Sequence, residues 1–266
     1  MPVAKVGEIN LCYKVSGEGH PLILITGFAS AQNVWFSQVR AFSRFYHVVT
    51  FDNRGFGKSD KPAGPYTTKM LANDTVALMD RLGIKKAHIL GGSMGGMAAQ
   101  EIAIEHPERL DKLILSSTSA GGQPFRDMLF GLIEAATPGW NRSRPDLASA
   151  NLQKFMVAVA SRSFNGKLYQ ILIMPLVKLQ ARLGRVKVPV GQLEAMLSHN
   201  ALERLDKIQA PTLVLTGSQD RLMPPHSSEG LASRIKGAKL VVIDRGAHAL
   251  GGERFNKEVL SFLGNK

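Results

Sequence analysis

A serine flanked by glycines stands where an apolar run gives way to a helix-like run. Ser93 is centred in the spacing Gly-x-Ser-x-Gly from Gly91 to Gly95, after residues 87–90 and before residues 97–103. A serine on a sharp strand-to-helix turn takes a strained backbone, and the residues two positions away must be small. Such a turn presents the hydroxyl beside a helix N-terminus, where free N–H groups can stabilise an oxyanion. The spacing predicts a nucleophile for acyl transfer, with a glycine-rich turn that merely contains serine as the alternative.

A serine hydroxyl becomes a strong nucleophile when a histidine takes its proton and a carboxylate orients that histidine. In parallel α/β sheets such groups gather at the carboxyl ends of strands. Asp220 comes three residues after the predicted strand 211–217, and His248 follows the next predicted strand. The chain order Ser93, Asp220, His248 therefore predicts a catalytic triad. Asp244, at the end of the last strand, is the alternative acid, and by position alone Asp220 and His248 could be turn or loop residues.

An oxyanion formed at Ser93 needs two backbone N–H donors. Met94, the residue after the nucleophile, is expected to supply one of them. The loop after the apolar run 22–25 begins Thr-Gly-Phe. Gly27 allows this loop to turn, and Phe28 is expected to supply the second donor. An ordinary turn at a strand end is the alternative interpretation.

Alternating strands and helices would bring these groups to one edge of a sheet. Short apolar or alternating runs predict strands at 3–6, 9–15, 22–25, 47–51, 87–90, 113–115, 211–217 and 240–243. Helical spacing of apolar residues predicts helices at 34–45, 68–82, 97–106, 226–235 and 254–263.

The segment 121–206 contains helix-like runs with no strands between them. These runs lie at 128–135, 152–160 and 168–183, the last broken at Pro175. The simplest architecture is an α/β fold with one doubly wound, mostly parallel sheet and a helical cap inserted after the sixth core strand. Residues 1–120 and 207–266 would form the core domain, and residues 121–206 would form the cap.

Composition describes an ordinary globular chain with a basic surplus. Its 266 residues are 44% hydrophobic, and the formal net charge is +12. No apolar run reaches the roughly 18 residues of a membrane helix, and the N-terminus lacks the apolar region of a signal peptide. Cys12 is the sole cysteine, which leaves no internal disulfide and no thiolate cluster for a metal. We expect a cytoplasmic protein without a membrane span, in which Cys12 is a small buried residue.

The basic residues match no nucleic-acid motif, so we expect no nucleic-acid partner. They are denser in the segment 126–187, which holds ten Lys or Arg against three acids. A solvated basic surface is the simpler interpretation of this segment, and a binding face for an anionic surface or partner is the alternative.

Five sequence marks occur together and in one order. They are Thr26-Gly27-Phe28, Asp52-Asn53-Arg54-Gly55-Phe56-Gly57-Lys58-Ser59, the Ser-Met-Gly-Gly elbow, Gly217-Ser218-Gln219-Asp220 and Gly246-Ala247-His248. Together they resemble the α/β-hydrolase fold superfamily over essentially the whole chain. The resemblance is greatest to the carboxylesterase, enol-lactonase and cofactor-free perhydrolase cluster, with proline iminopeptidase-like relatives nearby. It implies a helical cap over the active site and an activity that needs no cofactor and no metal.

Two departures from the family pattern bear on the site. Thr26 stands where the family often has histidine, but the oxyanion donors are backbone groups and should be retained. The nucleophile is Ser93 instead of aspartate, which argues against haloalkane dehalogenases and epoxide hydrolases. The segment 52–59 is a structural marker in the family, so Asp52 and Arg54 are assigned a structural pairing role and no catalytic one.

The residues and the resemblance together predict a serine hydrolase. It would cleave small to medium, hydrophobic acyl or aryl esters through an acyl-enzyme on Ser93. Its partner would be a small-molecule ester or lactone. Lactone hydrolysis, proline iminopeptidase-like action and C–C bond hydrolysis use the same triad and stay open. A non-catalytic receptor is disfavoured because all three triad members are present.

Cap side chains should decide among these substrates. An aminopeptidase would need an acid there, and the candidates are Asp127, Glu134, Asp146, Glu194 and Glu203. Apolar side chains of the cap could line an acyl pocket, although core packing is the simpler interpretation for most of them: Phe125, Met128, Leu129, Phe130, Trp140, Phe155, Met156 and Met174.

Overall fold

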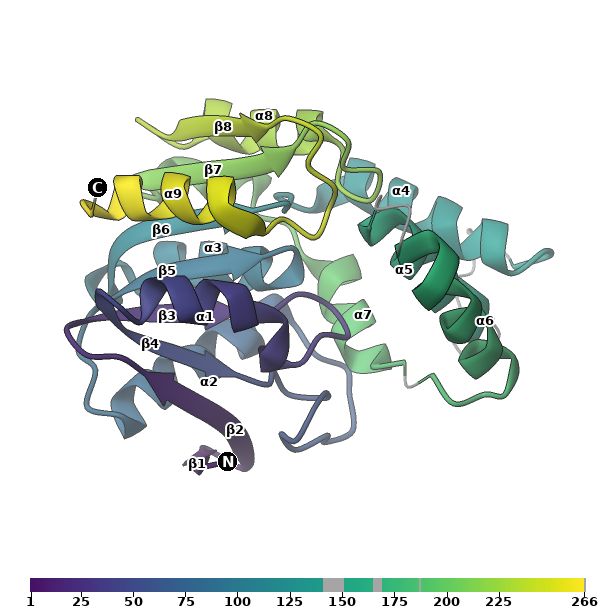
Figure 1. Ribbon diagram of the computed structural model, residues 1–266, viewed down its shortest axis with the longest axis horizontal. Coiled ribbons are helices and arrows are strands. Elements are labelled where there is room, and N and C mark those ends of the chain that lie inside the picture. Colours follow the sequence, from purple (N-terminus) through teal and green to yellow (C-terminus); the bar gives the residue numbers. More distant parts are fainter. Residues whose placement is uncertain (141–150, 165–168, 187, 266) are drawn as a thin grey trace.

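The fold is built on an eight-stranded sheet with the strand order β1-β2-β4-β3-β5-β6-β7-β8 (Figure 1). The computed structural model describes residues 1–140, 151–164, 169–186 and 188–265. The strands are β1 (Val3–Val6), β2 (Ile9–Ser16), β3 (His20–Ile25), β4 (Tyr46–Phe51), β5 (Ala87–Gly92), β6 (Leu110–Ser116), β7 (Thr212–Gly217) and β8 (Lys239–Ile243). β2 pairs antiparallel with both β1 and β4, and the six strands from β4 to β8 in the sheet order pair parallel. The predicted mostly parallel sheet is confirmed.

Helices cover both faces of the sheet, as a doubly wound fold requires. One face carries α1 (Phe36–Phe42) and α9 (Gly252–Leu263), and the other carries α2 (Thr68–Arg81), α3 (Met94–Glu105) and α8 (Pro225–Arg234). Central strands read as continuous apolar runs because both of their faces are buried. In β3, the four residues from Leu22 to Ile25 are at most 1% exposed.

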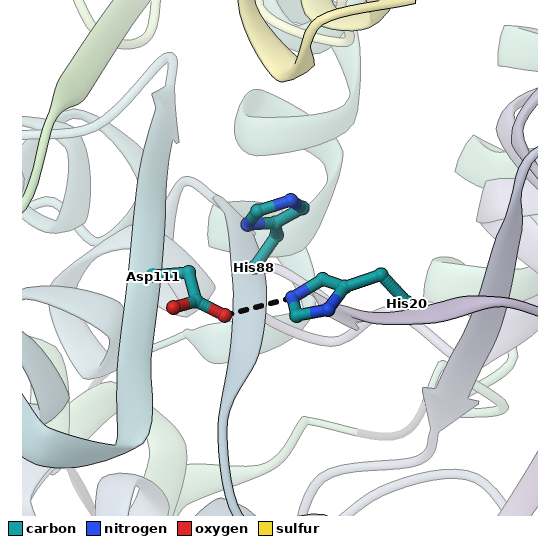
Figure 2. A group of neighbouring side chains, drawn as sticks. All are labelled: His20, His88 and Asp111. Atoms are coloured by element: carbon teal, nitrogen blue, oxygen red, sulfur yellow. Dashed lines mark ion pairs between the residues drawn. The ribbon is translucent and has the colours of Figure 1, made fainter.

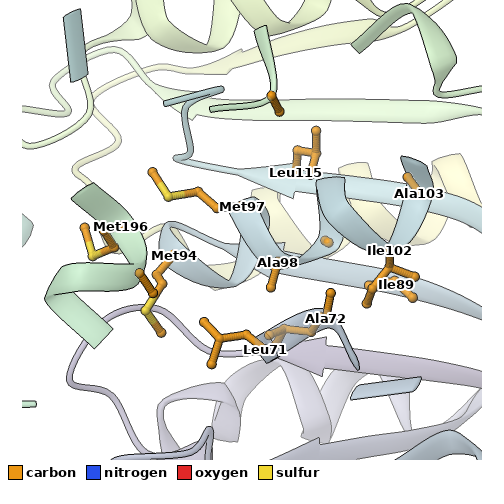
Figure 3. Close-up of a cluster of buried hydrophobic side chains, with 14 of the residues drawn as sticks. Leu71, Ala72, Ile89, Met94, Met97, Ala98, Ile102, Ala103, Leu115 and Met196 are labelled. Carbon is orange, nitrogen blue, oxygen red and sulfur yellow. The ribbon is translucent and has the colours of Figure 1, made fainter. Parts of the chain in front are cut away.

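Helix α3 is the centre of the larger core (Figure 3). Its Ala98 and Ile102 are fully buried, and α3 packs on α2 and on strand β5. Near its start, Met94 lies beside Met196 (Figure 3). Because the helix is fixed on several sides, the residue that precedes it is held firmly as well.

A helical segment lies between β6 and β7. It contains α4 (Gly122–Ala136), α5 (Leu152–Ser163), the π-helical turn η4 (Tyr169–Ile173), α6 (Met174–Arg182), α7 (Val190–Ser198) and the 3₁₀ helix η5 (Leu202–Lys207). Figure 1 shows α4, α5 and α6 grouped together beyond one end of the sheet, while α7 returns toward the core. The predicted fold class, with helices inserted after the sixth strand, is confirmed.

Three predicted helices differ from those in the structure. Residues 34–45 form the 3₁₀ helix η1 (Gln32–Trp35) followed by a short α1 that ends at Phe42. The run 128–135 belongs to a longer helix that begins at Gly122. The run 168–183 is divided beside Pro175: the π-helical turn η4 ends at Ile173, and α6 begins at Met174 with Pro175 in its first turn, where a missing N–H is tolerated.

A buried ionic network connects α3 to the segment that returns to the sheet. The Glu101 carboxylate accepts hydrogen bonds from Arg204 at 2.7 and 2.9 Å, and His199 Nδ1 lies 3.4 Å from Glu101 Oε1. Thr68 Oγ1 lies 2.9 Å from the same His199 nitrogen. Burial raises the pKa of Glu101, but the bonds from His199 and Arg204 outweigh it and bring the pKa to about 2. The network therefore holds Glu101 ionised at neutral pH.

Among the described residues, no helix combines the length and the apolar character needed to cross a bilayer. Cys12 is buried and free, in agreement with the role expected for it.

Candidate active site

Ser93 stands between the end of strand β5 at Gly92 and the start of helix α3 at Met94. Its backbone has φ 53° and ψ −119°, outside the regions where residues with side chains are ordinarily found. A Cβ on Gly91 would stand 2.3 Å from the carbonyl oxygen of Gly95. A Cβ on Gly95 would stand 2.2 Å from the carbonyl oxygen of Ile25. Both glycines are therefore needed for this turn to form.

Hydrogen bonds from the end of β6 hold the strained turn. The Ser93 N–H donates to the Ser116 carbonyl at 2.8 Å, and Thr118 Oγ1 donates to the Ser93 carbonyl at 2.7 Å. Thr118 also packs against Gly96, where a Cβ would come within 2.7 Å of its side chain. The backbone of Ser93 is thus fixed on both sides of its Cα.

The loop after β3 lies directly beside the serine. A Cβ on Gly27 would stand 3.2 Å from the Cβ of Ser93. The buried Asn53 donates from Nδ2 to both the carbonyl oxygen and Oγ1 of Thr26, each at 3.0 Å. The threonine that replaces the family's histidine is therefore held by an amide from the loop after β4.

The two expected oxyanion donors border the serine. Phe28 lines the same cavity as Ser93. Met94 is the first residue of α3, where N–H groups have no acceptor within the helix. The structure thus places Phe28 on the cavity that Ser93 also lines, and its role as an oxyanion donor stays a prediction.

Gln192 on α7 is a contact that sequence analysis missed. Its Oε1 accepts a hydrogen bond from the Ala29 N–H at 3.0 Å, and its Nε2 donates to the Arg54 carbonyl at 2.8 Å. The side chain is fully buried, and it connects the loop that contains Phe28 to the inserted helices. An amide within the otherwise mainly apolar run 190–197 was the available signal.

Asp220 and His248 come together at the ends of β7 and β8. His248 Nδ1 lies 2.9 Å from Asp220 Oδ2. Asp220 Oδ1 also accepts backbone N–H bonds from Leu222 at 2.9 Å and Met223 at 2.7 Å. These bonds orient the carboxylate, which in turn orients the imidazole. The rival acid Asp244 is exposed and lies 3.6 Å from Arg245, so Asp220 is the acid that contacts the histidine.

Ser93 and His248 line the same cavity. Because Asp220 takes Nδ1, Nε2 is the nitrogen of His248 left to exchange a proton. In the described parts of the chain no hydrogen bond joins Ser93 Oγ to this ring. Such contacts often shorten only when substrate is bound.

A cavity of about 440 Å³ opens beside Ser93. Most of its wall is apolar and comes from both the sheet side and the inserted helices: Phe28, Val34, Trp35, Phe125, Met128, Leu129, Phe155, Val159, Phe164, Met196, Leu222, Met223 and Leu250. Hydroxyl groups supply much of the polar part: Ser30, Ser37, Ser116, Ser117 and Ser163. Among the described residues, no aspartate or glutamate lines the cavity.

Of the eight apolar side chains that could line a pocket or pack in the core, four line this cavity: Phe125, Met128, Leu129 and Phe155. The other four lie elsewhere. Phe130 and Trp140 stack on each other with ring centroids 5.5 Å apart. Met156 packs against the large core, and Met174 is 2% exposed inside α6. Of the acids proposed for an amine site, Asp146 lies outside the described residues, and the other four do not line the cavity.

The inserted helices also contact the histidine loop. The Ala249 N–H donates to the carbonyl oxygen of Ser163, the last residue of α5, at 2.9 Å. Together with Gln192, this bond joins the inserted segment to two of the loops that surround Ser93.

Asp52 and Arg54 have structural partners, but they do not pair with each other. Arg54 forms a two-pronged ion pair with Asp74 of α2 at 2.5 Å. Asp52 is buried and accepts the backbone N–H groups of Gln32 at 2.7 Å and Lys58 at 2.8 Å. The two residues thus fix the 52–59 loop, from which Asn53 reaches Thr26.

A second group of titratable side chains lies at the other ends of the strands, near the starts of β3, β5 and β6 (Figure 2). His20 Nε2 is 2.7 Å from Asp111 Oδ2, and Lys86 Nζ is 3.0 Å from Asp111 Oδ1. One ligand atom each from His20, His88 and Asp111 lies within 4.8 Å of the others, close enough for a metal site. His20 and Lys86 already contact the two carboxylate oxygens of Asp111, and a metal there would have to break both contacts, so we assign this group an ion-pairing role.

Comparison with known proteins agrees with this fold. A family model described as alpha/beta hydrolase fold matches residues 20–254. The chain is 27% identical over 270 residues to a protein named carbamate hydrolase RutD from Azorhizobium caulinodans, with 99% of this chain and 98% of the relative covered. It is 30% identical over 233 residues to a poly(3-hydroxyalkanoate) depolymerase from Ectopseudomonas oleovorans, with 85% and 77% covered.

The solved structures include similar folds along the whole chain. The enol-lactonase from Burkholderia xenovorans LB400 has a TM-score of 0.80 and 29% sequence identity, with 98% of this chain and 99% of that chain covered. The relatives thus carry names of several hydrolytic reactions on one architecture.

Proposed function

The chain belongs to the α/β hydrolase fold family and is a hydrolase, and from that premise we propose that it cleaves carboxylic esters with a serine nucleophile. Ser93 is the nucleophile, His248 is the general base and acid, and Asp220 orients His248. The N–H groups of Phe28 and Met94 bind the oxyanion. The observation that carries the proposal is the 2.9 Å contact between Asp220 and His248, beside the cavity that His248 shares with Ser93.

The proposed reaction follows from the positions of these groups. His248 Nε2 takes the Ser93 proton as the oxygen attacks the ester carbonyl, and Asp220 stabilises the imidazolium that forms. The backbone donors stabilise the tetrahedral oxyanion. His248 then protonates the leaving alcohol, and a water activated by the same nitrogen releases the acid from Ser93.

The cavity wall supports a hydrophobic ester as substrate. An apolar acyl or aryl group gains free energy by leaving water, at roughly 25 cal/mol for each Å² of buried apolar surface. A free α-amine would need a carboxylate partner in the same space. No described lining residue is an acid, and this favours ester cleavage over aminopeptidase action.

We assign residues 121–206 to a cap domain and residues 1–120 with 207–266 to the core domain. The proposal is supported by cavity-lining side chains on α4, α5 and α7, among them Phe125, Phe155 and Met196. The cap would therefore decide acyl preference, while the core supplies the reacting groups.

Replacement of the nucleophile tests the proposal. We expect Ser93→Ala to abolish hydrolysis of a short p-nitrophenyl ester while circular dichroism stays that of the parent. Ser233→Ala, which removes an exposed hydroxyl on α8, is the matched control and should keep full activity. A fluorophosphonate should label the parent once, on the peptide that contains Ser93. Retained turnover in Ser93→Ala, or labelling of another residue, would reject the assignment.

Lactone hydrolysis is the second candidate. It is favoured by the 29% identity to a structure named as an enol-lactonase, and it would use the same residues on a cyclic ester. Parallel kcat/KM measurements on linear aryl esters and on lactones of equal carbon number separate the two. A preference for lactones would identify the chain as a lactonase without changing the proposed triad.

A further inference from the structure

One stretch of the chain is free of acidic residues. Residues 147–193 contain no aspartate or glutamate and seven lysines or arginines. In a protein with 33 basic and 21 acidic residues, this places a large share of the net positive charge on a short segment. The stretch includes α5, η4 and α6, and Figure 1 shows α5 and α6 beyond one end of the sheet.

Helix α6 has its apolar side chains on the outside as well as the inside. Met174 and Ala181 are buried and face the rest of the molecule. Leu176, Leu179 and the C-cap residue Leu183 are 54%, 50% and 53% exposed. Spacings of three and seven residues place these leucines together on the opposite face of the helix.

The exposed apolar surface continues into the preceding turn. Ile171, Leu172 and Ile173 are all exposed, and none of them lines the cavity beside Ser93. We call the six side chains at 171–173, 176, 179 and 183 the outer apolar face. An exposed apolar patch on a monomer usually marks an interaction site.

Basic side chains border the outer apolar face. Lys178, Arg182 and Arg185 are exposed, and Lys178 and Arg182, four residues apart, lie on one flank of the leucine row. Within the described ranges these three cations take part in no ion pair. Their charges are therefore available to a partner, and their long stems can extend sideways while the leucines enter an apolar phase.

We propose that the outer apolar face and its basic border dock the protein onto the surface of an anionic phospholipid bilayer. An apolar helix face bordered by Lys and Arg is the composition of helices that lie in the interface of a membrane. Anionic headgroups would neutralise the three cations as the leucines enter the acyl boundary. A second copy of the chain is a poorer occupant, because two faces with the same basic border repel each other.

Vesicle co-sedimentation with the full chain tests the proposal. We expect binding to phosphatidylcholine vesicles that contain phosphatidylglycerol, weaker binding to phosphatidylcholine alone, and release as salt is raised. Leu176→Asp with Leu179→Asp should weaken binding at least about tenfold. Val3→Asp with Val15→Asp is the matched control, since it adds the same two charges at residues of β1 and β2 that are 58% and 40% exposed, and it should bind as the parent does.

A second pair of variants tests how much the basic side chains contribute to vesicle binding. Lys178→Glu with Arg182→Glu should weaken binding to anionic vesicles at least about tenfold. Arg254→Glu with Lys257→Glu makes the same change in net charge on the exposed side of α9 and should have a much smaller effect. Hydrolysis of a soluble ester by all four variants should equal that of the parent, so this readout is independent of docking.

Three outcomes would overturn the proposal. They are a parent protein that does not sediment with anionic vesicles, equal weakening by the α6 and α9 charge variants, and a concentration-dependent dimer in sedimentation velocity that Leu176→Asp with Leu179→Asp abolishes. The last result would assign the outer apolar face to self-association.

Discussion

At the level of single residues, the site depends on the strained backbone of Ser93 and on the two glycines that stand two positions away from it. Ser93 occupies a conformation with φ 53°, and such conformations cost of order 1–3 kcal/mol for a residue with a Cβ. Gly91 and Gly95 avoid the same problem because they have no Cβ to collide. The strain thus falls on the residue proposed to react.

Glycine at position 93 should relieve this strain. We expect Ser93→Gly to be more stable than Ser93→Ala by about 1 kcal/mol, because relief of strain exceeds the extra entropy of the unfolded glycine. Thermal or urea unfolding of the two variants measures the difference, and both lack the hydroxyl. An alanine variant as stable as the glycine variant would show that the turn is not strained.

Residue types and strand ends were enough to predict that Asp220 contacts His248. Asp220 is preferred over Asp244 because Asp244 stands only four residues before His248 and should flank the same loop. Gln192 was missed because its contacts join the segment 121–206 to the loop after β3. A link of that kind depends on how an inserted segment folds back, and no local pattern encodes it.

At the scale of elements, the strands were easier to predict than the helices that cover the site. Buried parallel strands are short apolar runs, and β3 to β8 were all found with small shifts at their ends. The inserted helices carry apolar residues on more than one side, so periodicity predicted helices in the runs 128–135, 152–160 and 168–183 without all of their ends, and it did not predict α7. The run 168–183 is an example, since it divides into the π-helical turn η4 and α6.

Helix α7 should affect catalysis through Gln192, which bonds to the loop that contains Phe28. Gln192 holds the Ala29 N–H, next to the proposed donor Phe28. We expect Gln192→Leu to lower kcat about tenfold with little change in KM, since loss of a positioning hydrogen bond is worth about 1.4 kcal/mol. The readout is steady-state kinetics on a p-nitrophenyl ester.

A second glutamine of the inserted segment provides the control for Gln192. Gln153 on α5 donates to the Val186 carbonyl at 2.8 Å and so bonds within the segment. Gln153→Leu should leave kcat close to that of the parent. Equal losses in the two variants would mean that any disturbance of the inserted helices slows the reaction.

At the level of the whole molecule, the carboxyl ends and the amino ends of the strands carry different kinds of side chains. The carboxyl ends of β3, β5, β7 and β8 carry Ser93, Asp220, His248 and the Phe28 loop. The amino ends of β3, β5 and β6 carry the ion-paired group shown in Figure 2. The length of the strands thus separates the proposed catalytic residues from the ion-paired group. The folded protein therefore contains buried titratable groups outside the candidate site.

These groups make stability depend on pH in a defined order. Burial, with contributions from the nearby His20 and Lys112 and opposed by Asp111, lowers the pKa of His88 to about 4 from 6.5. The unfolded chain therefore binds a proton between these values that the folded chain does not, and stability falls as pH drops from about 6.5 to about 4. The pKa of Glu101 is about 2 against 4.5, so a second decline follows below about pH 4.5.

Urea unfolding at a series of pH values checks this order. His88→Phe keeps the ring that packs against Tyr46 and His20 but cannot titrate, so the slope between about pH 6.5 and pH 4 should become shallower. Part of it should remain, because burial also lowers the pKa of His199. The decline below about pH 4.5 should be unchanged, because it belongs to Glu101 and its bonds to Arg204 and His199. An unaltered upper slope in His88→Phe would show that His88 is protonated in the folded protein as readily as in the unfolded chain.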